Sequence, residues 1–191
     1  MSENDPRNVV LTFDDGPSIE QTPILLDILS KQNVKAVFFV LGKRLVTQRG
    51  IDIATRAVNE GHALGNHTYS HPDLRNLNQS QVLDELSRTH DLISKCNCDC
   101  KLFRPPFGNN TTTAQKVVDD FGYQTIMWNV NSLDWKLKAG RLWVDHTVFK
   151  ISNLPESIVL MHDIHESTIT YVESLIQKIK NIPRSQFVTY W

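Results

Sequence analysis

The chain alternates short apolar runs with segments whose apolar residues recur at helical spacing. Runs rich in apolar, β-branched and aromatic residues predict buried strands at residues 9–13, 36–40 and 158–161. Briefer strands are expected at residues 102–103, 125–128 and 187–189, and a short apolar run at 63–64 leads into Asn66 and His67. Because these runs are apolar almost throughout rather than alternately polar, we expect both faces of the sheet to be covered.

Between the strands, apolar residues recur every three or four positions, as on one face of an amphipathic helix. The first such face follows Thr22 and Pro23, so we expect Thr22 to cap this helix and Pro23 to occupy its first position. Gly61 and Gly122 are placed to end the second and fourth helices. The helical faces lie within residues 24–29, 53–58, 82–93, 117–121 and 169–179.

The repeated order of strand and helix predicts an α/β fold with a parallel sheet. A closed or nearly closed barrel and an open doubly wound sheet both fit this order. No Gly-x-Gly-x-x-Gly follows the first strand, which argues against a dinucleotide site. The chain contains no internal repeat, low-complexity stretch or linker, so we expect one domain over residues 1–191.

Composition changes this interpretation little. Of 191 residues, 40% are hydrophobic and 21% are charged, with a net charge of −1. This balance is ordinary for a globular protein and indicates neither a nucleic-acid partner nor an anionic membrane surface. We find no apolar run long enough for a membrane segment and no sign of an obligate protein partner.

The first residues are polar and do not form a secretory signal peptide. We therefore expect a cytoplasmic protein if the chain is full length, and a secreted or cell-wall associated one if a leader has been removed.

Three cysteines, Cys96, Cys98 and Cys100, alternate in a short polar segment. An odd number does not make a disulfide framework. The alternatives are a small thiolate metal site and a polar loop with free thiols, with one strained bridge at most. We favour the loop, because structural zinc sites have wider ligand spacing and a fourth ligand.

Polar residues that could support catalysis cluster where the predicted strands end. Each alone has an ordinary explanation, such as a turn, a surface charge or a hydrogen-bonded buried histidine. In parallel α/β folds, however, the carboxyl ends of the strands meet on one face. The clusters are Asp14 and Asp15, His67 and His71, Arg104 and Phe107, Asp134 and Trp135, and His162.

His67 and His71 are four residues apart, so both can reach one metal ion. A carboxylate from elsewhere would complete a set of two histidines and one carboxylate, which leaves open positions for water and substrate. Zn²⁺ suits such nitrogen and oxygen ligands, and Co²⁺ or another divalent metal would also bind.

Five segments, in this order, resemble the motifs of the polysaccharide deacetylase family, also called carbohydrate esterase family 4 or the NodB-homology domain. They are Thr-Phe-Asp-Asp-Gly-Pro at 12–17, His-Thr-Tyr-Ser-His at 67–71, Arg-Pro-Pro-Phe-Gly at 104–108, Asp-Trp at 134–135 and Leu-Met-His at 160–162. The resemblance implies a single irregular (β/α) barrel of about seven parallel strands, similar to a TIM barrel. It therefore favours the barrel over the open doubly wound sheet.

The same resemblance implies the role of each site residue. Asp14 would be the general base, paired with Arg104, and His162 would be the general acid, tuned by Asp134. The metal would be held by Asp15, His67 and His71. Substrate would be bound by the backbone N–H of Phe107, at the oxyanion, and by an acetyl pocket lined by Trp135 and Leu160.

These roles suit amide hydrolysis. A carboxylate that is not bound to the metal can take the proton of the attacking water, and a histidine can protonate the leaving nitrogen. Because neighbouring side chains of an extended chain point apart, we expect Asp14 and Asp15 to divide the work of base and ligand. The metal and Arg104 would keep Asp14 ionised.

Two positions depart from the family pattern. Asn131 stands where many relatives carry Asp, and Phe107 where many carry Tyr. We assign Asn131 no catalytic role, and the contact implied for Phe107 uses its backbone.

The run His162-Asp163-Ile164-His165 resembles the peptidoglycan deacetylases of bacteria. His165 would either touch substrate or be an exposed loop residue, and we favour the second.

The function implied is a metal-dependent hydrolase that removes N-acetyl groups from β-1,4-linked N-acetylglucosamine in chitin, chitooligosaccharides or peptidoglycan. The alternatives are an O-deacetylase of acetylated xylan and a non-catalytic glycan-binding relative. Loss of the base or of a metal ligand would favour the last, and neither is lost here.

Overall fold

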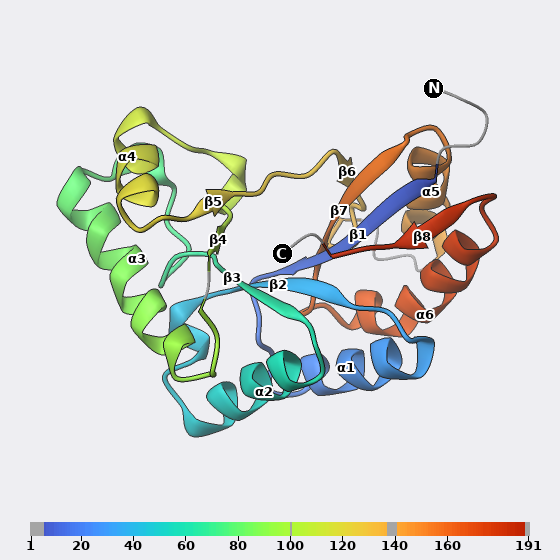
Figure 1. Cartoon of the computed structure of the whole chain (residues 1–191), viewed down its shortest axis with the longest axis horizontal. Coiled ribbons are helices and arrows are strands. Elements are labelled where there is room, and N and C mark those ends of the chain that lie inside the picture. Colours follow the sequence, from blue (N-terminus) through green and yellow to red (C-terminus); the bar gives the residue numbers. More distant parts are fainter. Residues whose placement is uncertain (1–5, 100, 137–140, 190–191) are drawn as a thin grey trace.

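The computed structural model describes residues 6–99, 101–136 and 141–189, and shows an inner layer of strands with helices outside it (Figure 1). The strands are β1 (Arg7–Asp14), β2 (Ala36–Val40), β3 (Ala63–Asn66), β4 (Leu102–Phe103), β5 (Gln124–Thr125), β6 (Val130–Asn131), β7 (Glu156–His162) and β8 (Ser185–Phe187). The α-helices are α1 (Gln21–Gln32), α2 (Gln48–Asn59), α3 (Gln79–Ser94), α4 (Thr112–Asp120), α5 (Arg141–Ser152) and α6 (Glu166–Lys180). Single 3₁₀ turns form η1 (Gly42–Arg44), η2 (Leu74–Asn76) and η3 (Pro106–Gly108).

The sheet is parallel and curls into an open barrel. Its strands follow the order β5-β4-β3-β2-β1-β7-β6, and β8 adds to the beginning of β1. There is room for β8 because it pairs with β1 at residues 7–9, whereas β2 pairs with β1 only from Leu11 onward. The barrel-like α/β fold is therefore confirmed, with seven strands on the main path through the described residues.

Alternate residues of β1 face two different cores. Val9, Leu11 and Phe13 point outward into the large core between the sheet and the helices. Val10 points inward, into a small core at the bottom of the barrel that it shares with Val37, Phe39, Leu102 and Ile126. Thr12 and Asp14 continue the inward face, so the period of the strand brings Asp14 to the top of the barrel interior.

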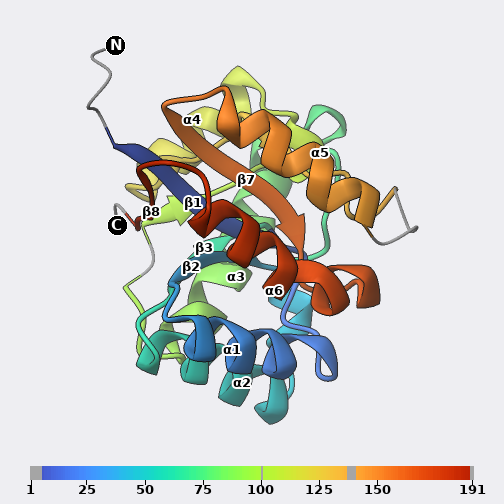
Figure 2. The same cartoon turned by 90° about the vertical axis from the view of Figure 1, so that its right-hand side faces the viewer.

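Helices cover the outer face of the sheet, and α5 and α6 flank β7 (Figures 1 and 2). Helix α5 was not predicted from the sequence. Its buried face consists of Trp143, Val144, Thr147 and Ile151, but Leu142 and Phe149 lie on the exposed side and hide the helical period. Gly61 and Gly122 follow the ends of α2 and α4 with left-handed φ angles of 87° and 69°, as predicted.

The expected cap of the first helix is wrong. Helix α1 begins at Gln21, so Pro23 is its third residue, and no side chain caps the helix at Glu20. Thr22 is engaged elsewhere: its hydroxyl accepts a hydrogen bond from the N–H of Ser18 and donates one to Asp163. Thr22 thus closes the turn before the helix and makes a tertiary contact instead of capping the helix.

The strand expected at 125–128 is also shorter than predicted. β5 ends at Thr125, because the next carbonyl groups serve Arg104 and not a neighbouring strand: Ile126 O accepts from Nε at 2.9 Å and Met127 O from Nη2 at 3.4 Å. A further strand, β6, follows at Val130–Asn131 and was not predicted. The last strand, β8, covers 185–187 where we expected 187–189.

Cys96 and Cys98 are free thiols, as favoured above, but Cys96 is a core residue and not part of a polar loop. Its Sγ is fully buried beside the carbonyl groups of Ile51 and Leu92. Burial raises the pKa of both thiols, which opposes a thiolate metal site. Cys100 lies outside the described residues.

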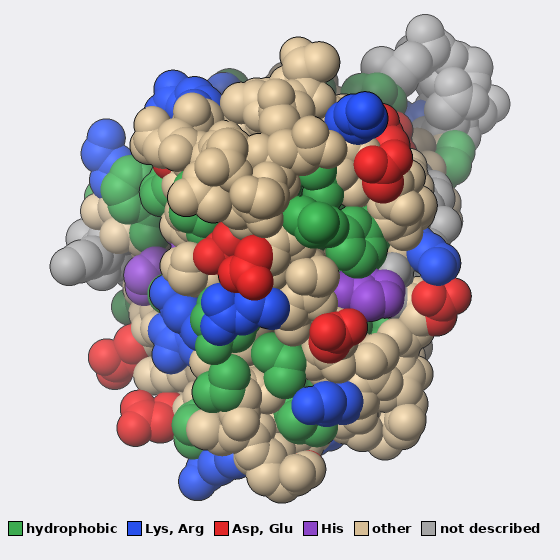
Figure 3. Space-filling model, turned by 90° about the vertical axis from the view of Figure 1, so that its left-hand side faces the viewer, with side chains coloured by type: hydrophobic (Ala, Val, Ile, Leu, Met, Phe, Trp, Pro, Cys, Tyr) green, Lys and Arg blue, Asp and Glu red, His purple; other side chains and the backbone are tan. Residues whose placement is uncertain are grey.

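The surface on the α3 and α4 side carries acidic and basic side chains intermixed (Figure 3). It shows no large area of a single charge. Within the described ranges, no helix has the length and apolar content needed to cross a bilayer.

Candidate active site

A cavity of about 600 Å³ opens at the carboxyl ends of the strands. Eight residues singled out from the sequence line it: Asp14, Asp15, His67, His71, Phe107, Trp135, Leu160 and His162. The two others lie behind its wall, where Arg104 contacts Asp14 and Asp134 contacts His162. The structure thus brings all ten residues together at one end of the barrel.

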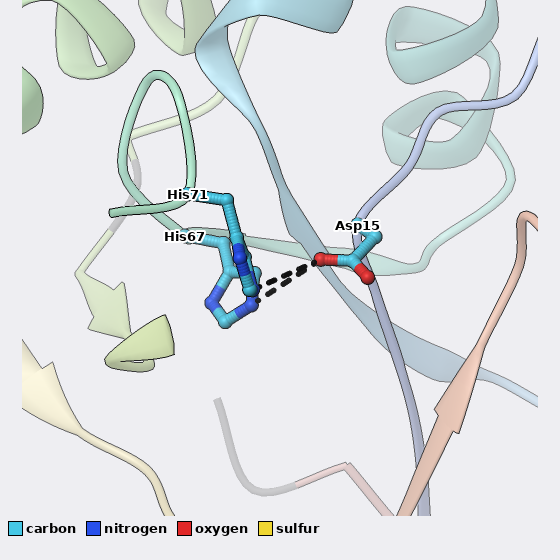
Figure 4. A group of neighbouring side chains, drawn as sticks. All are labelled: Asp15, His67 and His71. Carbon is cyan, nitrogen blue, oxygen red and sulfur yellow. Dashed lines mark ion pairs between the residues drawn. The ribbon is translucent and has the colours of Figure 1, made fainter. Parts of the chain in front are cut away.

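Asp15, His67 and His71 form one compact group of potential metal ligands (Figure 4). Asp15 Oδ1 lies 3.6 Å from Nε2 of His67 and 3.4 Å from Nε2 of His71. Bonds of about 2.0–2.1 Å to a tetrahedral Zn²⁺ would place neighbouring ligand atoms about 3.3–3.4 Å apart. The observed spacing therefore fits a small divalent cation.

The hydrogen bonds around this group also fit a cation. Nδ1 of His67 lies 2.7 Å from the carbonyl oxygen of Arg104, which can only accept, so Nδ1 carries the proton and Nε2 presents a lone pair. Burial lowers the pKa of His67 to about 3, which keeps its ring neutral. Asp15 Oδ1 is buried and has no hydrogen-bond partner among the described residues. A cation placed between lone pairs that face one another in this way would satisfy both of them.

The backbone of Asp15 differs from our expectation. Asp14 is the last residue of β1 and points into the barrel, so an extended Asp15 would point away from it. Instead Asp15 has a left-handed φ of 76°, which turns its carboxylate back toward His67. Both carboxylates consequently approach Nε2 of His67, Asp14 Oδ2 at 3.7 Å and Asp15 Oδ1 at 3.6 Å.

Arg104 holds Asp14 from inside the barrel. Its Nη1 donates to Asp14 Oδ1 at 2.8 Å and to the Thr12 hydroxyl at 2.7 Å, and its guanidinium lies 4.1 Å from the ring centre of Phe39. Burial raises the pKa of Asp14, and Arg104 opposes this rise without offsetting it. A divalent cation in the adjacent ligand group would favour the ionised carboxylate further.

His162 is held on the other side of the cavity by Asp134. The Asp134 carboxylate lies 3.0 Å from Nδ1 of His162 and accepts the backbone N–H of His162 at 2.7 Å and the Thr168 hydroxyl at 2.6 Å. Burial lowers the pKa of His162, but the hydrogen bond and charge of Asp134 outweigh burial and, with Asp14 and Asp15, raise the pKa to about 9. His162 is therefore protonated at neutral pH, with Nε2 left to face the cavity.

Apolar and aromatic side chains form the rest of the wall. Leu160 is buried, while Trp135 and Phe107 are exposed over 46% and 62% of their surface and stand at the rim. The ring of Phe107 packs edge-on against His71, with centroids 4.5 Å apart. Five wall residues were given no firm role from the sequence: Pro105, Trp128, Asn131, Ile164 and His165.

His165 lies in a loop, as expected, but the expectation that it is exposed is wrong. It is half-buried on the cavity wall, with its ring centre 5.5 Å from that of His162. The short loop between β7 and α6 turns it back toward the site.

Asp163 was also missed, because it adjoins a motif without belonging to it. It is fully buried beneath the turn that carries Asp15, with one carboxylate oxygen bound to Thr22 and the other without a partner among the described residues. A Cβ added to Gly16 would lie 2.1 Å from its Oδ2. Burial raises the pKa of Asp163 to about 7.

Comparison with known proteins places this geometry in a family. A sequence model described as polysaccharide deacetylase matches residues 2–126. A peptidoglycan-N-acetylglucosamine deacetylase of Bacillus cereus is 32% identical over 186 residues, which cover 95% of this chain and 66% of that protein. The chain spans less than two thirds of the length of the first curated relatives it matches.

Solved structures agree over nearly the whole chain. The T48 deacetylase, solved with substrate, has a TM-score of 0.88 and 35% identity, over 96% of this chain and 88% of that one. A family 4 pseudoenzyme of Bacillus anthracis has a TM-score of 0.82 and 31% identity, over 97% of this chain and 64% of that one. The shared fold thus occurs both with and without activity. The function therefore has to be inferred from the site residues.

Proposed function

The chain belongs to the polysaccharide deacetylase family, and we propose that it is a metal-dependent hydrolase that releases acetate from N-acetylglucosamine units of a β-1,4-linked glycan. We propose further that residues 1–191 form a single deacetylase domain. The observation that carries the proposal is the arrangement within one cavity: a carboxylate held by Arg104 on one side, a histidine held by Asp134 on the other, and the ligand group of Asp15, His67 and His71 beside the carboxylate.

Asp15, His67 and His71 would hold the metal, with Zn²⁺ the first choice and Co²⁺ an alternative. A divalent metal bound there would polarise the substrate carbonyl and lower the pKa of water. The donor set supports this assignment because the Nε2 atoms of both histidines face Oδ1 of Asp15, which has no hydrogen-bond partner in the described part of the chain.

Asp14 would act as the general base. Its Oδ1 is bound to Arg104, while its Oδ2 faces the ligand group and can accept the proton of the attacking water. The guanidinium fixes the orientation of the carboxylate, so that this oxygen is presented to the cavity.

His162 would act as the general acid. Its protonated ring can deliver a proton from Nε2 to the leaving nitrogen, while Nδ1 stays bound to Asp134. An amine anion is a very poor leaving group, so the proton has to arrive as the C–N bond breaks. The acetyl group would lie against Leu160 and Trp135, and the backbone N–H of Phe107 would stabilise the oxyanion.

The substrate assignment rests on the names of the relatives. The Bacillus cereus relative acts, by its name, on peptidoglycan N-acetylglucosamine, and a Bradyrhizobium relative with 36% identity is called a chitooligosaccharide deacetylase. Both names describe N-deacetylation of a β-linked amino sugar. Peptidoglycan and chitin oligomers are therefore the first substrates to compare.

The decisive experiment measures acetate release from peptidoglycan, chitin oligomers and acetylated xylan by the same preparation, before and after chelation. We expect release from at least one N-acetylated glycan, its loss on chelation and its return with Zn²⁺ or Co²⁺. A His67→Ala variant, which lacks one of the three ligands, provides the control. Release from acetylxylan alone would replace the N-deacetylase by an O-deacetylase, and full activity in metal-free protein would end the metal proposal.

A further inference from the structure

The loop from His67 to His71 carries both histidines of the ligand group and has a strained backbone. Thr68 and His71 have left-handed φ angles of 69° and 68°. Such conformations are unfavourable in residues other than glycine and persist only where the surroundings enforce them. The contacts that enforce this loop therefore decide where the two imidazole rings lie.

Every backbone N–H of the loop has an identified acceptor. Those of His67, Thr68 and His71 donate to Val40 O, Asn66 Oδ1 and Thr68 Oγ1, which lie within the loop or the adjoining strands. The remaining two, of Tyr69 and Ser70, both donate to one oxygen of Glu85 at 2.8 Å. The other oxygen of Glu85 accepts the Ser70 hydroxyl at 2.7 Å.

Glu85 lies on α3, outside the loop and outside the catalytic motifs. The opposite edge of the loop is held by the turn after β2, where Gly42 N–H and Lys43 N–H donate to the carbonyl groups of Thr68 and Tyr69 at 3.0 Å. The loop is thus held between the turn after β2 and helix α3. Every hydrogen bond that the structure records between the loop backbone and α3 is accepted by Glu85. Its neighbour on the helix, Arg88, lies 3.5 Å above the ring of Tyr69.

We propose that Glu85 is a positioning residue for the metal site: it fixes the backbone at Tyr69 and Ser70 and thereby sets the distance and orientation of His67 and His71. This inference rests on the proposed function, because it assumes that the ligand group binds a metal. Glu85 contacts neither imidazole. It acts through three charge-assisted hydrogen bonds, which it accepts from the backbone N–H groups of Tyr69 and Ser70 and from the Ser70 hydroxyl.

Two variants of equal length separate the acceptor from the bulk of the side chain. Glu85→Met keeps the length and removes both acceptor atoms. Glu85→Gln keeps one acceptor oxygen, which can receive both backbone N–H groups because they share one oxygen in the native protein. Asp91→Met is the matched control, since Asp91 is an exposed carboxylate on the same helix whose side chain makes no hydrogen bond within the described ranges.

The first measurement is the dissociation constant for Zn²⁺, by competition with a chromophoric chelator, at a temperature where each metal-free variant is folded. Loss of a residue that orients metal ligands typically weakens metal affinity about 10–100-fold. We expect a loss in this range for Glu85→Met, a smaller one for Glu85→Gln and none for Asp91→Met. A role in folding alone would lower the unfolding temperature of the metal-free protein and leave the dissociation constant unchanged.

The second measurement is hydrogen exchange of the loop in the metal-free protein. The amides of Tyr69 and Ser70 should exchange faster in Glu85→Met than in the native protein, whereas the amide of His67, which donates to Val40 O, should be unaffected. Should Glu85→Met not fold, Glu85→Gln decides the question by the same two measurements.

The outcomes separate this inference from the proposed function. If the native protein binds no metal, the metal proposal itself fails. If the native protein binds Zn²⁺ and the folded Glu85 variants bind it equally well with unchanged exchange, the metal site stands and the positioning role of Glu85 is overturned.

Discussion

Asp14 and His162 are register partners at the ends of two adjacent parallel strands, β1 and β7. Side chains of paired residues project from the same face of a sheet, so the carboxylate and the imidazole both point into the cavity. Each is fixed from behind by one residue of opposite charge, Arg104 for Asp14 and Asp134 for His162. The proposed base and the proposed acid are thereby placed on neighbouring strands at the same level, which suits proton transfer at two sides of one amide.

Asp14→Asn should separate proton transfer from metal binding. The amide keeps the shape of the side chain and can still face Arg104, but it cannot take a proton from water. We expect turnover to fall by about 10²–10⁴-fold, the usual contribution of a general base, with metal content close to native. Turnover and bound metal are to be measured on the same preparation.

The control is Asp15→Asn, because Asp15 supplies the oxygen that faces both histidines. This variant should lose metal as His67→Ala does. If Asp14→Asn loses its metal to the same extent, the two aspartates have exchanged roles.

Asp134 should determine the basic limb of the pH profile. The pKa of His162 is raised to about 9, so its protonated, acidic form is present below that pH and is lost as pH rises through it. N-deacetylation should therefore decline above a pH of about 9. Asp134→Asn removes the charge that raises this pKa, and the decline should move to lower pH. An unchanged basic limb in Asp134→Asn, measured as kcat/KM against pH, would show that another group titrates there.

Sequence patterns predicted well which residues meet at the site, because the carboxyl ends of parallel strands all lie on one face of the fold. Asp14, His67, Arg104 and His162 each follow or end an apolar run, and the fold alone brings them together. The motifs also indicated which neighbours belong with them, such as Asp134 beside His162.

Features that depend on the path of the backbone could not be predicted in the same way. The left-handed φ of Asp15 reverses the direction that an extended chain would give its side chain. Glu85 and Asp163 touch the site through partners far away in sequence, the loop at 67–71 and the turn at 16–22. On the sequence, Glu85 is one of several charged residues on a helical surface, and only the packed structure distinguishes it.

Gly16→Ala should destabilise the turn that carries Asp15. A methyl group there would lie 2.1 Å from Asp163 Oδ2. Asp163 is buried and this oxygen is bound to Thr22, so moving the carboxylate aside would disturb that hydrogen bond. Overpacking of this kind typically costs about 1–3 kcal/mol. Urea unfolding of the metal-free protein measures the loss.

A double-mutant cycle tests the cause. In Gly16→Ala combined with Asp163→Ala the clash is gone, so the double variant should be more stable than the sum of the two single effects predicts. Strictly additive effects would mean that Gly16 is required for some reason other than the approach of Asp163.

His162→Ala should show a loss that depends on the leaving group. If His162 protonates the departing nitrogen, its removal leaves metal binding intact and slows the cleavage of an amide, whose amine anion cannot leave unaided. An activated aryl acetate releases a stable phenolate and needs little help from an acid. N-deacetylation should therefore fall much further than aryl acetate hydrolysis in the same preparation.

The ratio of these two losses is more informative than either loss alone, because any general damage to the cavity enters both rates and cancels. Asp134→Asn provides the graded comparison: it keeps the imidazole but weakens its protonation, so its ratio should lie between those of the native protein and His162→Ala. Equal losses on both substrates would assign His162 to substrate binding or to the oxyanion. The acid would then have to come from elsewhere, and His165, whose ring centre is 5.5 Å from that of His162, would be the next residue to replace.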